Sequence, residues 1–450
     1  MPPPTYIPLR VSLPNTLRLA RDPIQIFSEY VARYGQNYYL HVGGTRSSLI
    51  TTDPDTIQHV LQRNHRNYRK SEIQADQLAL YLGKGLLTND GEDWLRQRRL
   101  IQPGFHRDRL AALPDLMLAV IDEEVDYLSR AARTGEPIDV YQRMLHTAFR
   151  IVARTLFSED IADEDLARLG ALITRLQEFV ILPMRLPLVR PFLRWFGIQG
   201  HYQNLSRQAF SLLDELIDRR RESGHRRDDL LQMLLDARYE DTGEPMAPQR
   251  LLEELVILFV AGHETSANAL SWTFYLLGEH PEHLAELRRE WQTVLGEKRP
   301  SFADLRSLTY TTQVIEESMR LYPPAWITDR VALADDATEA FPIPAGTLVA
   351  PYIYGLHHHP DLWPEPEVFR PERFTAAAKK ERHPYAYIPF GGGPRLCIGA
   401  SFAMMEMQLV LVEVLRRFDL VLAPGAEVVP KALVTLRPRH GLPMILRERQ

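Results

Sequence analysis

The chain has 450 residues, of which 45% are hydrophobic and 25% charged, so it is long enough to bury a large core. Its formal net charge of −5 provides no basic field of the kind that favours nucleic acid as a partner. It contains one cysteine, Cys397, which excludes an internal disulfide, a Cys-x-x-Cys redox pair and an all-cysteine metal cage.

The amino terminus, MPPPTYIP, lacks a basic segment followed by an apolar run, and no stretch approaches about 18 uninterrupted apolar residues. We therefore expect no signal peptide, no transmembrane anchor and a soluble, cytoplasmic protein. Alternating residues at 38–42 and 47–52 predict a β-hairpin, and helical periodicity then runs from Asp55 to about Glu279. Strand patterns return after Ile327, and no linker divides the chain.

Two segments of the helical part combine apolar and cationic residues. In GEDWLRQRR, Trp94 and Arg98 lie four apart and therefore share one face of a predicted helix. Phe179–Phe196 (FVILPMRLPLVRPFLRWF) is an apolar stretch between two predicted helices, interrupted by prolines and arginines. It is expected either to pack against the domain or to touch a membrane surface.

Residues from about Pro248 to Gly278 predict a helix of about 30 residues, which at about 1.5 Å per residue spans about 45 Å. It is apolar on most faces and should be buried. The segment AGHETS, Ala261–Ser266, places Glu264 beside Thr265 in its middle, where an ionisable group is costly without partners. Either Thr265 bonds back to a carbonyl one turn earlier and Glu264 forms a salt bridge, or the pair has a chemical role.

Farther along, Glu317 and Arg320 are three apart and share a helix face, and Pro323-Pro324 ends that helix. Such pairs are common and usually solvated, so this pair alone indicates little about structure or function. It becomes informative only together with Arg373 in PERF downstream. The run 357–359 (His-His-His) is predicted to be extended, so its side chains alternate between faces and make poor joint metal ligands.

Cys397 lies in a glycine-rich loop, FGGGPRLCIG, that leads into an apolar helical stretch from Ile398 to Phe418. Because the chain has only one cysteine, three uses of its thiol remain: a buried inert group, a nucleophile or a single axial metal ligand. The loop favours the metal ligand. Free N–H groups in the first turn of a helix lower the pKa of a thiol, and glycines let a flat ligand approach the backbone closely.

At Phe390, Gly393, Arg395, Cys397 and Gly399 the sequence resembles the cytochrome P-450 family, the haem-thiolate monooxygenases. The resemblance covers nearly the whole chain. It implies a mainly α fold with small β sheets in a single domain, 1–450. Within it, a β-rich region would cover about 35–55, a helical core about 55–325, and a β-rich and haem-loop region about 326–450.

The resemblance also implies a haem b cofactor (iron protoporphyrin IX) with Cys397 as the axial ligand of the iron. The other residues that it assigns to the cofactor are Trp94, Arg98, Ala261, Arg330, Phe390, Gly391, Arg395 and Gly399. Tyr387 stands where some members place a histidine that binds a haem propionate. Glu317, Arg320 and Arg373 would form a buried structural triad that braces the cysteine loop.

For catalysis, the resemblance implies that Glu264 and Thr265 supply protons during oxygen activation, and that a local distortion at Thr265 opens a groove. Small Ala261 and Gly262 would leave room for dioxygen. A small lipophilic substrate is expected. Its pocket would be lined by Ala261, Trp326, Ile327 and residues 77–87, with Phe179–Phe196 over the entrance.

No fused reductase is recognisable before Gln450, so we expect electrons from an external ferredoxin or flavodoxin with its NAD(P)H reductase. The basic residues expected at its docking site on the cysteine side are Arg96, Arg99, Lys379, Lys380 and Arg382. Three alternatives remain open: a peroxide-driven peroxygenase, a haem-thiolate isomerase or dehydratase, and a haem carrier or sensor without enzymatic activity.

Overall fold

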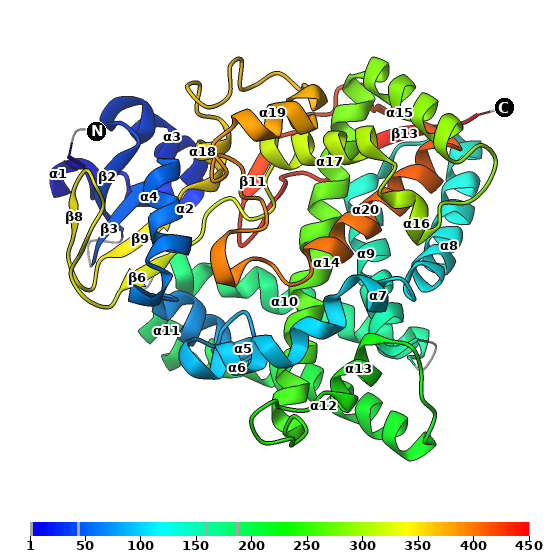
Figure 1. The fold of residues 1–450 in the computed structure, drawn as a ribbon, viewed down its shortest axis with the longest axis horizontal. Coiled ribbons are helices and arrows are strands. Elements are labelled where there is room, and N and C mark those ends of the chain that lie inside the picture. The colour runs from blue at the N-terminus through cyan, green and yellow to red at the C-terminus, as the bar shows by residue number, and fades with distance from the viewer. Residues whose placement is uncertain (1–2, 43–45, 159–160, 186–188, 450) are drawn as a thin grey trace.

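The long apolar helix is present as α14 (Pro248–Glu279) and runs through the middle of the molecule (Figure 1). The computed structural model describes residues 3–42, 46–158, 161–185 and 189–449. Proline at the first turn favours the start of α14, and Pro281, which cannot continue a helix, begins α15 (Pro281–Val294). The predicted length of this helix is therefore confirmed.

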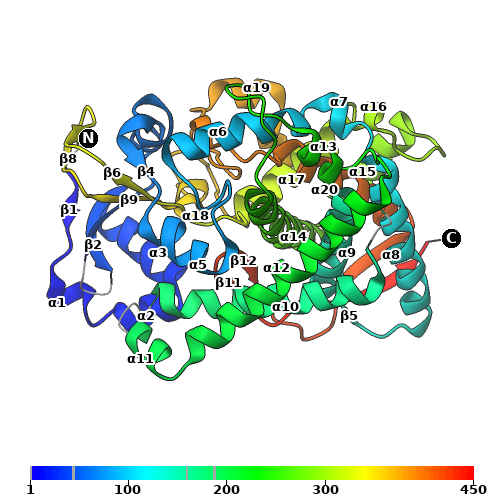
Figure 2. The same cartoon turned by 90° about the horizontal axis from the view of Figure 1, so that it is seen from below.

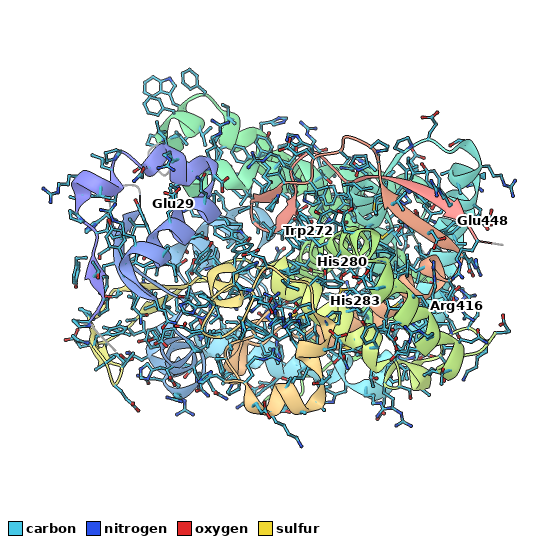
Figure 3. The ribbon with its side chains drawn as sticks, turned by 90° about the horizontal axis from the view of Figure 1, so that it is seen from above. Glu29, Trp272, His280, His283, Arg416 and Glu448 are labelled. Carbon is cyan, nitrogen blue, oxygen red and sulfur yellow. The ribbon has the colours of Figure 1, made fainter. Side chains whose placement is uncertain are left out.

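Helices from distant parts of the chain surround α14. The main neighbours are α9 (Val140–Phe157), α12 (Ile198–Ser223), α17 (Thr309–Leu321) and α20 (Ala400–Leu415). Trp272 on α14 is fully buried near the centre of the molecule (Figure 3) and stacks on Tyr322, with 4.0 Å between the ring centroids. This core gives the middle of α14 a rigid setting.

The predicted hairpin is confirmed, since β2 (Asn37–Val42) pairs antiparallel with β3 (Arg46–Thr51). The C-terminal part of the chain extends the same sheet, because β9 (Leu348–Pro351) runs parallel to β3 with Leu49 opposite Val349. The strand order is β1-β2-β3-β9-β6-β4. The remaining strands of this sheet are β1 (Thr5–Tyr6), β4 (Tyr68–Arg69) and β6 (Arg330–Ala332).

Three smaller sheets complete the β structure. β10 (Phe418–Leu422), β13 (Pro443–Glu448) and β5 (Ile138–Asp139) form one; β11 (Pro430–Ala432) and β12 (Leu436–Pro438) form the second; β7 (Asp336–Ala337) and β8 (Pro342–Ile343) form the third.

The remaining helices cover the core and the large sheet (Figure 2). The α-helices among them are α1 (Leu9–Ser12), α2 (Thr16–Arg21), α3 (Pro23–Tyr34), α4 (Pro54–Gln58), α5 (Ala79–Leu82), α6 (Gly91–Ile101), α7 (Arg107–Leu110), α8 (Pro114–Thr134), α10 (Asp163–Arg185), α11 (Arg190–Trp195), α13 (Leu230–Asp236), α16 (Phe302–Leu305), α18 (Ile353–His357) and α19 (Ala376–Glu381). The short π- or 3₁₀-helical turns are η1 (His59–Arg63), η2 (His65–Asn67), η3 (Ile73–Leu78), η4 (Gln102–Phe105), η6 (Pro371–Phe374) and η7 (Gly393–Arg395). No helix among these described residues is both long and apolar enough to cross a bilayer.

Three local expectations were wrong. Phe179–Phe196 is largely helical, because α10 continues through Pro183 to Arg185 and α11 follows at Arg190. The histidine run is not extended, since α18 ends at His357. The helix after the cysteine loop is shorter than predicted, from Ala400 to Leu415, because Phe418 already begins β10.

Candidate active site

The cysteine loop is closed by a backbone hydrogen bond from Cys397 N to Phe390 O of 2.9 Å. Gly391 and Gly393 have φ of 76° and 67°, in the left-handed region that favours glycine. A Cβ atom at Gly393 would lie 1.9 Å from the carbonyl oxygen of Leu61. The glycines therefore allow this turn and its close approach to η1.

The Cys397 side chain is accessible, yet it lies deep enough for burial to raise the pKa of its thiol. The N–H of Gly399 and the positive charge of Arg98 act in the opposite direction. The lowering expected from the backbone N–H groups is thus present through Gly399, but burial outweighs it and the net pKa of the thiol is raised. A thiolate at this sulfur needs a cationic partner such as a metal ion.

The middle of α14 presents Ala261 as an accessible residue in an otherwise largely buried segment, with Thr265 half-buried one turn later. Thr265 Oγ1 donates a 2.7 Å hydrogen bond to Ala261 O, and the helix is uninterrupted, so the distortion expected at Thr265 is absent. A Cβ atom at Gly262 would lie 3.1 Å from Val152 on α9. Gly262 thus packs closely against α9.

Glu264 is only 6% exposed, and within the described residues it forms hydrogen bonds but no ion pair. Its Oε2 accepts a 2.8 Å bond from Gln177 on α10, and its Oε1 accepts a 2.8 Å bond from Thr435. Burial raises the pKa of Glu264, while the Thr435 hydrogen bond and the charge of Arg437 oppose that shift. The carboxyl group is therefore biased towards its protonated form.

Trp94 on α6 is buried between two cations. Arg395 lies 5.2 Å and Lys70 5.9 Å from its ring centroid. Arg395 also forms an ion pair with Asp90 at 2.5 Å and donates to Tyr68 O at 3.1 Å. The structure thus brings Trp94 and Arg395 together, as the resemblance implies.

Arg330 and Lys70 are 7% and 6% exposed, and within the described residues neither forms an ion pair with a carboxylate. Arg330 donates to Asp329 O at 2.6 Å, and Lys70 donates to Leu86 O at 2.6 Å and Asn89 O at 2.7 Å. Burial lowers the pKa of Lys70 to about 7 and that of Arg330 to about 10. The positive charge of Arg395 adds to both shifts, and that of Arg330 adds to the shift of Lys70.

Two buried cations without carboxylate partners are costly, so this cluster suits a ligand that carries two carboxylates. The single thiol of Cys397 is accessible although its surroundings are largely buried. Such a sulfur can form one axial bond to a metal. Both features fit an iron porphyrin with two propionates. Sequence reasoning did not identify Lys70, because nothing local distinguishes it from a surface lysine.

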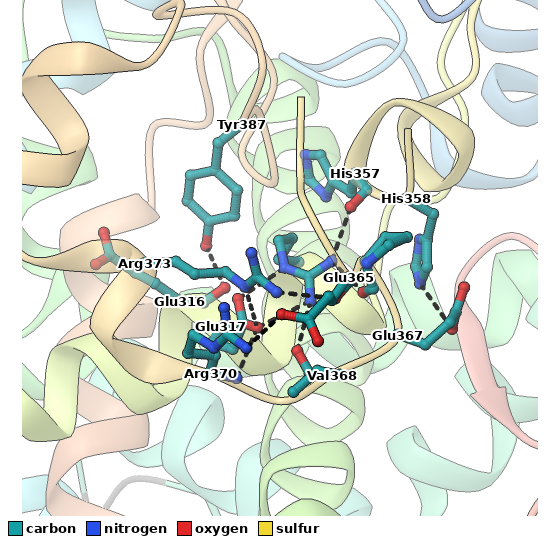
Figure 4. Close-up of polar contacts among 12 residues, drawn as sticks. Glu316, Glu317, His357, His358, Glu365, Glu367, Val368, Arg370, Arg373 and Tyr387 are labelled. Carbon is teal, nitrogen blue, oxygen red and sulfur yellow. Dashed lines mark hydrogen bonds and ion pairs between the residues drawn. The ribbon is translucent and has the colours of Figure 1, made fainter. Parts of the chain in front are cut away.

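The structural triad assembles on α17 and η6 (Figure 4). Arg320 donates to both carboxylate oxygens of Glu317, at 2.7 and 2.8 Å, and Arg373 Nε lies 3.4 Å from Glu317 Oε1. Glu317 and Arg320 are fully buried. Tyr387 belongs to this cluster and donates to Glu316 O at 2.9 Å, so it lies with the triad rather than with Arg395 and Trp94.

His357 connects the triad to the cysteine loop, a role that its sequence context does not indicate. Arg320 donates to His357 O at 2.9 Å, and the Nε2 atom of His357 accepts a 3.0 Å bond from the N–H of Ile388. Ile388 lies two residues before Phe390, the start of the loop. Within the described residues no group of His, Cys, Asp or Glu side chains is arranged to hold a metal ion.

Among the expected pocket residues, Trp326 is in the core. It is 6% exposed, packs on Phe27 and Tyr352, and donates to Leu433 O at 3.0 Å, because its large ring fills the space beneath the N-terminal sheet. Ile327 is half-buried beside the same cluster. The exposed members of the expected set are Ala261 and, within residues 77–87, Leu80 and Lys84.

Three of the five basic residues expected at a docking site are engaged within the chain. Arg96 pairs with Asp241 at 2.9 Å, and Lys379 pairs with Glu316 at 2.6 Å. Arg382 packs over Trp363, 4.2 Å from a ring centroid. Arg99 and Lys380 are exposed.

The sequence profile of the family described as Cytochrome P450 matches residues 1–441. The chain belongs to the cytochrome P450 family. Two similar proteins are from Streptomyces melanosporofaciens: cyclooctat-9-en-7-ol 5-monooxygenase (34% identical over 94% of this chain and 90% of that protein) and cyclooctatin synthase (33%, 94% and 91%). Rabbit (Oryctolagus cuniculus) cytochrome P450 4A7 is 32% identical over 90% of this chain and 82% of that protein.

A solved structure, the crystal structure of cytochrome P450DA heme domain, matches 100% of this chain and 97% of that chain with a TM-score of 0.87 and 23% identity. The fold is therefore the P450 fold, mainly helical with small sheets. Family membership makes the protein an oxidoreductase of the monooxygenase type with a haem cofactor.

Proposed function

We propose that the protein inserts one oxygen atom from dioxygen into a small lipophilic molecule, using electrons from a separate redox protein. The observation that carries this proposal is the accessible yet deep Cys397 together with buried cations that lack carboxylate partners. Cys397 would ligate the iron of haem b, and Trp94, Arg98, Arg330 and Arg395 would hold its carboxylates. Haem supplies reductive activation of dioxygen when it is bound.

Lys70 completes the set of proposed cofactor-binding residues, because its ammonium group lies among the same cations and is charged at and below a pH of about 7. Phe390, Gly391 and Gly399 would let the loop lie against the ring, and Ala261 would face it from α14. The bracing of the loop is assigned to Glu317, Arg320 and Arg373, with His357 as the link.

Glu264 and Thr265 are the proposed proton donors. Glu264 is held by Gln177 and Thr435 in a buried site that favours its protonated form. The hydroxyl of Thr265 donates to Ala261 O in the structure and can reorient to receive and pass on a proton.

The electron donor, a ferredoxin or flavodoxin, is proposed to dock on the outer side of the cysteine loop. A groove of about 620 Å³ lies there, lined by Leu396, Met404 and Phe302. Exposed Arg107 and Arg306 lie at the same groove and provide positive charge for an acidic partner.

A single reaction series tests the proposal. The purified holoprotein is incubated with a surrogate ferredoxin, its reductase, NADPH, isotopically labelled dioxygen and a panel of lipophilic compounds, among them cyclooctat-9-en-7-ol, the compound in a relative's name. The expected product carries one labelled oxygen atom and requires every component. Product formed only with peroxide would identify a peroxygenase, and product without labelled oxygen an isomerase or dehydratase.

A further inference from the structure

A cavity of about 200 Å³ lies where the long helix α14 and helix α17 end. His280, labelled in Figure 3, is one of its lining residues. None of the residues that line it is assigned above to the cofactor, the proton donors, the substrate pocket or the docking of an electron donor. The side chains that give the cavity its character are four aromatic rings and two carboxylates: Tyr275, Tyr322, Tyr354, Phe369, Glu279 and Glu367.

The charges at the wall of this cavity are negative. Glu279 and Glu367 are exposed, and among the described residues that line the cavity there is no lysine or arginine. Burial raises the pKa of Tyr275, and the charge of Glu279 adds to that shift. The charge of Glu367 likewise adds to burial in raising the pKa values of Tyr322 and Tyr354. The field of the two carboxylates therefore reaches the phenol groups at the wall.

Two helices end at the same place and add to this field. α14 ends at Glu279 and α17 ends at Leu321, and both residues line the cavity. The carbonyl end of a helix carries a partial negative charge, which favours a cation there. α14 has no basic residue in its last turn, and Arg320 in the last turn of α17 is held by Glu317 at 2.7 Å.

The aromatic rings offer faces and hydroxyl groups to a ligand. Tyr322 is fixed by stacking on Trp272 and Tyr354 by stacking on His358, each with 4.0 Å between the ring centroids. Within the described residues the hydroxyl groups of Tyr275, Tyr322 and Tyr354 form no hydrogen bond. Aromatic faces attract cations, and free phenol oxygens accept hydrogen bonds from them.

His358 adds a further acceptor to the wall. Its side chain is 9% exposed, and its Nδ1 atom donates a 2.8 Å hydrogen bond to Tyr354 O, so its Nε2 atom carries the lone pair. Figure 4 shows the ring facing Glu367, whose Oε2 lies 4.0 Å from Nε2. Burial lowers the pKa of His358 to about 3, so the ring is neutral at pH 7 and forms no ion pair with this carboxylate. Its lone pair is available to a donor on a ligand.

The ligand that matches these features is an organic cation. The described residues hold no cluster of His, Cys, Asp and Glu suited to a metal ion, and a volume of about 200 Å³ admits only a few carbon atoms. We propose that this cavity binds a short alkylamine in its protonated, ammonium form. The N–H groups would donate to His358 and to the tyrosine hydroxyls, and the positive charge would face Glu279 and Glu367.

Calorimetric titration of the purified holoprotein with butylammonium chloride tests the proposal. We expect saturable binding of one ion per chain and a thermal unfolding midpoint that rises with its concentration, because the ion binds only the folded chain. Butan-1-ol has the same chain without the charge, and potassium chloride has the charge without the chain; neither should displace butylammonium at equal concentration. No binding, or displacement by either compound, would overturn the proposal.

Variants locate the bound ion. Glu279→Gln/Glu367→Gln should weaken binding by roughly tenfold, because two charges that face the cation are removed. Glu136→Gln/Glu297→Gln removes the same charge from exposed residues outside the cavity and should leave binding unchanged. His358→Phe keeps an aromatic ring but lacks the acceptor, and should weaken binding several-fold. Equal affinities in all four proteins would overturn the assignment.

The haem absorption spectrum is followed in the same titrations, because the small unprotonated fraction of an amine can ligate haem iron. An unchanged spectrum during binding supports the cavity, whereas binding that always follows a spectral change would place the amine at the iron and overturn the proposal. The titration needs no turnover. Its failure would leave the monooxygenase proposal intact, and an inactive enzyme that binds butylammonium would leave the cation site intact.

Discussion

Cys397 is the residue on which the cofactor assignment depends. We expect Cys397→Ser to bind less haem and to lose the ferrous-carbonyl absorption band that thiolate ligation gives the family, since a hydroxyl group does not replace the thiolate as a ligand. Absorption spectra of the reduced, carbon monoxide-treated variant measure this. Leu396→Ser, at the exposed neighbouring position, is the control; an unchanged band in Cys397→Ser would contradict the assignment.

Thr265 is assigned a proton-transfer role on a helix that contains no distortion at this position. In Thr265→Ala we expect continued consumption of NADPH and dioxygen with a several-fold larger share released as peroxide, because the hydroxyl that passes the proton is missing. Product and peroxide are measured together. Thr273→Ala removes a hydroxyl bonded to Ala269 O at 2.7 Å in the same geometry on the same helix, and should not change that share. Unchanged coupling in Thr265→Ala would remove this residue from the relay.

At the scale of single elements, α17 and α18 support the cysteine loop through hydrogen bonds. His357→Leu removes the acceptor for Ile388 N–H and should destabilise the loop, so that thiolate-ligated haem is lost at lower denaturant concentration. The cost is expected to be about 1–3 kcal/mol. Denaturant titration followed by the carbonyl spectrum measures it, with the half-buried His359→Leu as control. Equal midpoints for the two variants would argue against the link.

The triad on α17 and η6 is a buried charge cluster, so breaking it should cost more than losing a surface pair. Glu317→Gln leaves Arg320 without its anionic partner, and we expect a loss of about 3–5 kcal/mol in the free energy of unfolding. Lys379→Gln, which breaks the pair with Glu316, should cost no more than about 1 kcal/mol. A small effect in Glu317→Gln would show that the triad does not support the loop.

The sequence predicts α14, the hairpin and the order of the motifs well, because each depends on local periodicity, prolines and glycines. It does not predict Lys70, His357 or Gln177, whose roles come from contacts with residues far away in the chain. It also misplaces Trp326, since an aromatic residue between two strand patterns fits a core and a pocket equally well. Local patterns thus identify candidate residues, but only the fold identifies their partners.

At the scale of the whole molecule, stability should depend on pH through Glu406 on α20. Burial raises the pKa of Glu406 from 4.5 to about 8, and the nearby Ser266 hydroxyl opposes the shift. Between these values the folded protein keeps a proton that the unfolded chain has released, so raising the pH lowers the free energy of unfolding, by at most about 1.4 kcal/mol per pH unit.

Glu406→Gln cannot titrate and should remove this contribution. The difference in the free energy of unfolding between the variant and the wild-type protein should therefore grow in favour of the variant as the pH rises from about 5 to about 8. Denaturant titrations at four pH values measure it. A difference that does not change with pH would show that Glu406 is charged in the folded protein.

The sheet that joins β3 to β9 pairs Thr51 with Pro351. A ribosome must therefore synthesise some 300 further residues after the hairpin before the hairpin's partner strand exists. During that interval the edge of β3 has no strand to bond with, and such edges promote aggregation. Production of this protein should consequently benefit from slow synthesis and from chaperones that cover an exposed strand until the C-terminal part arrives.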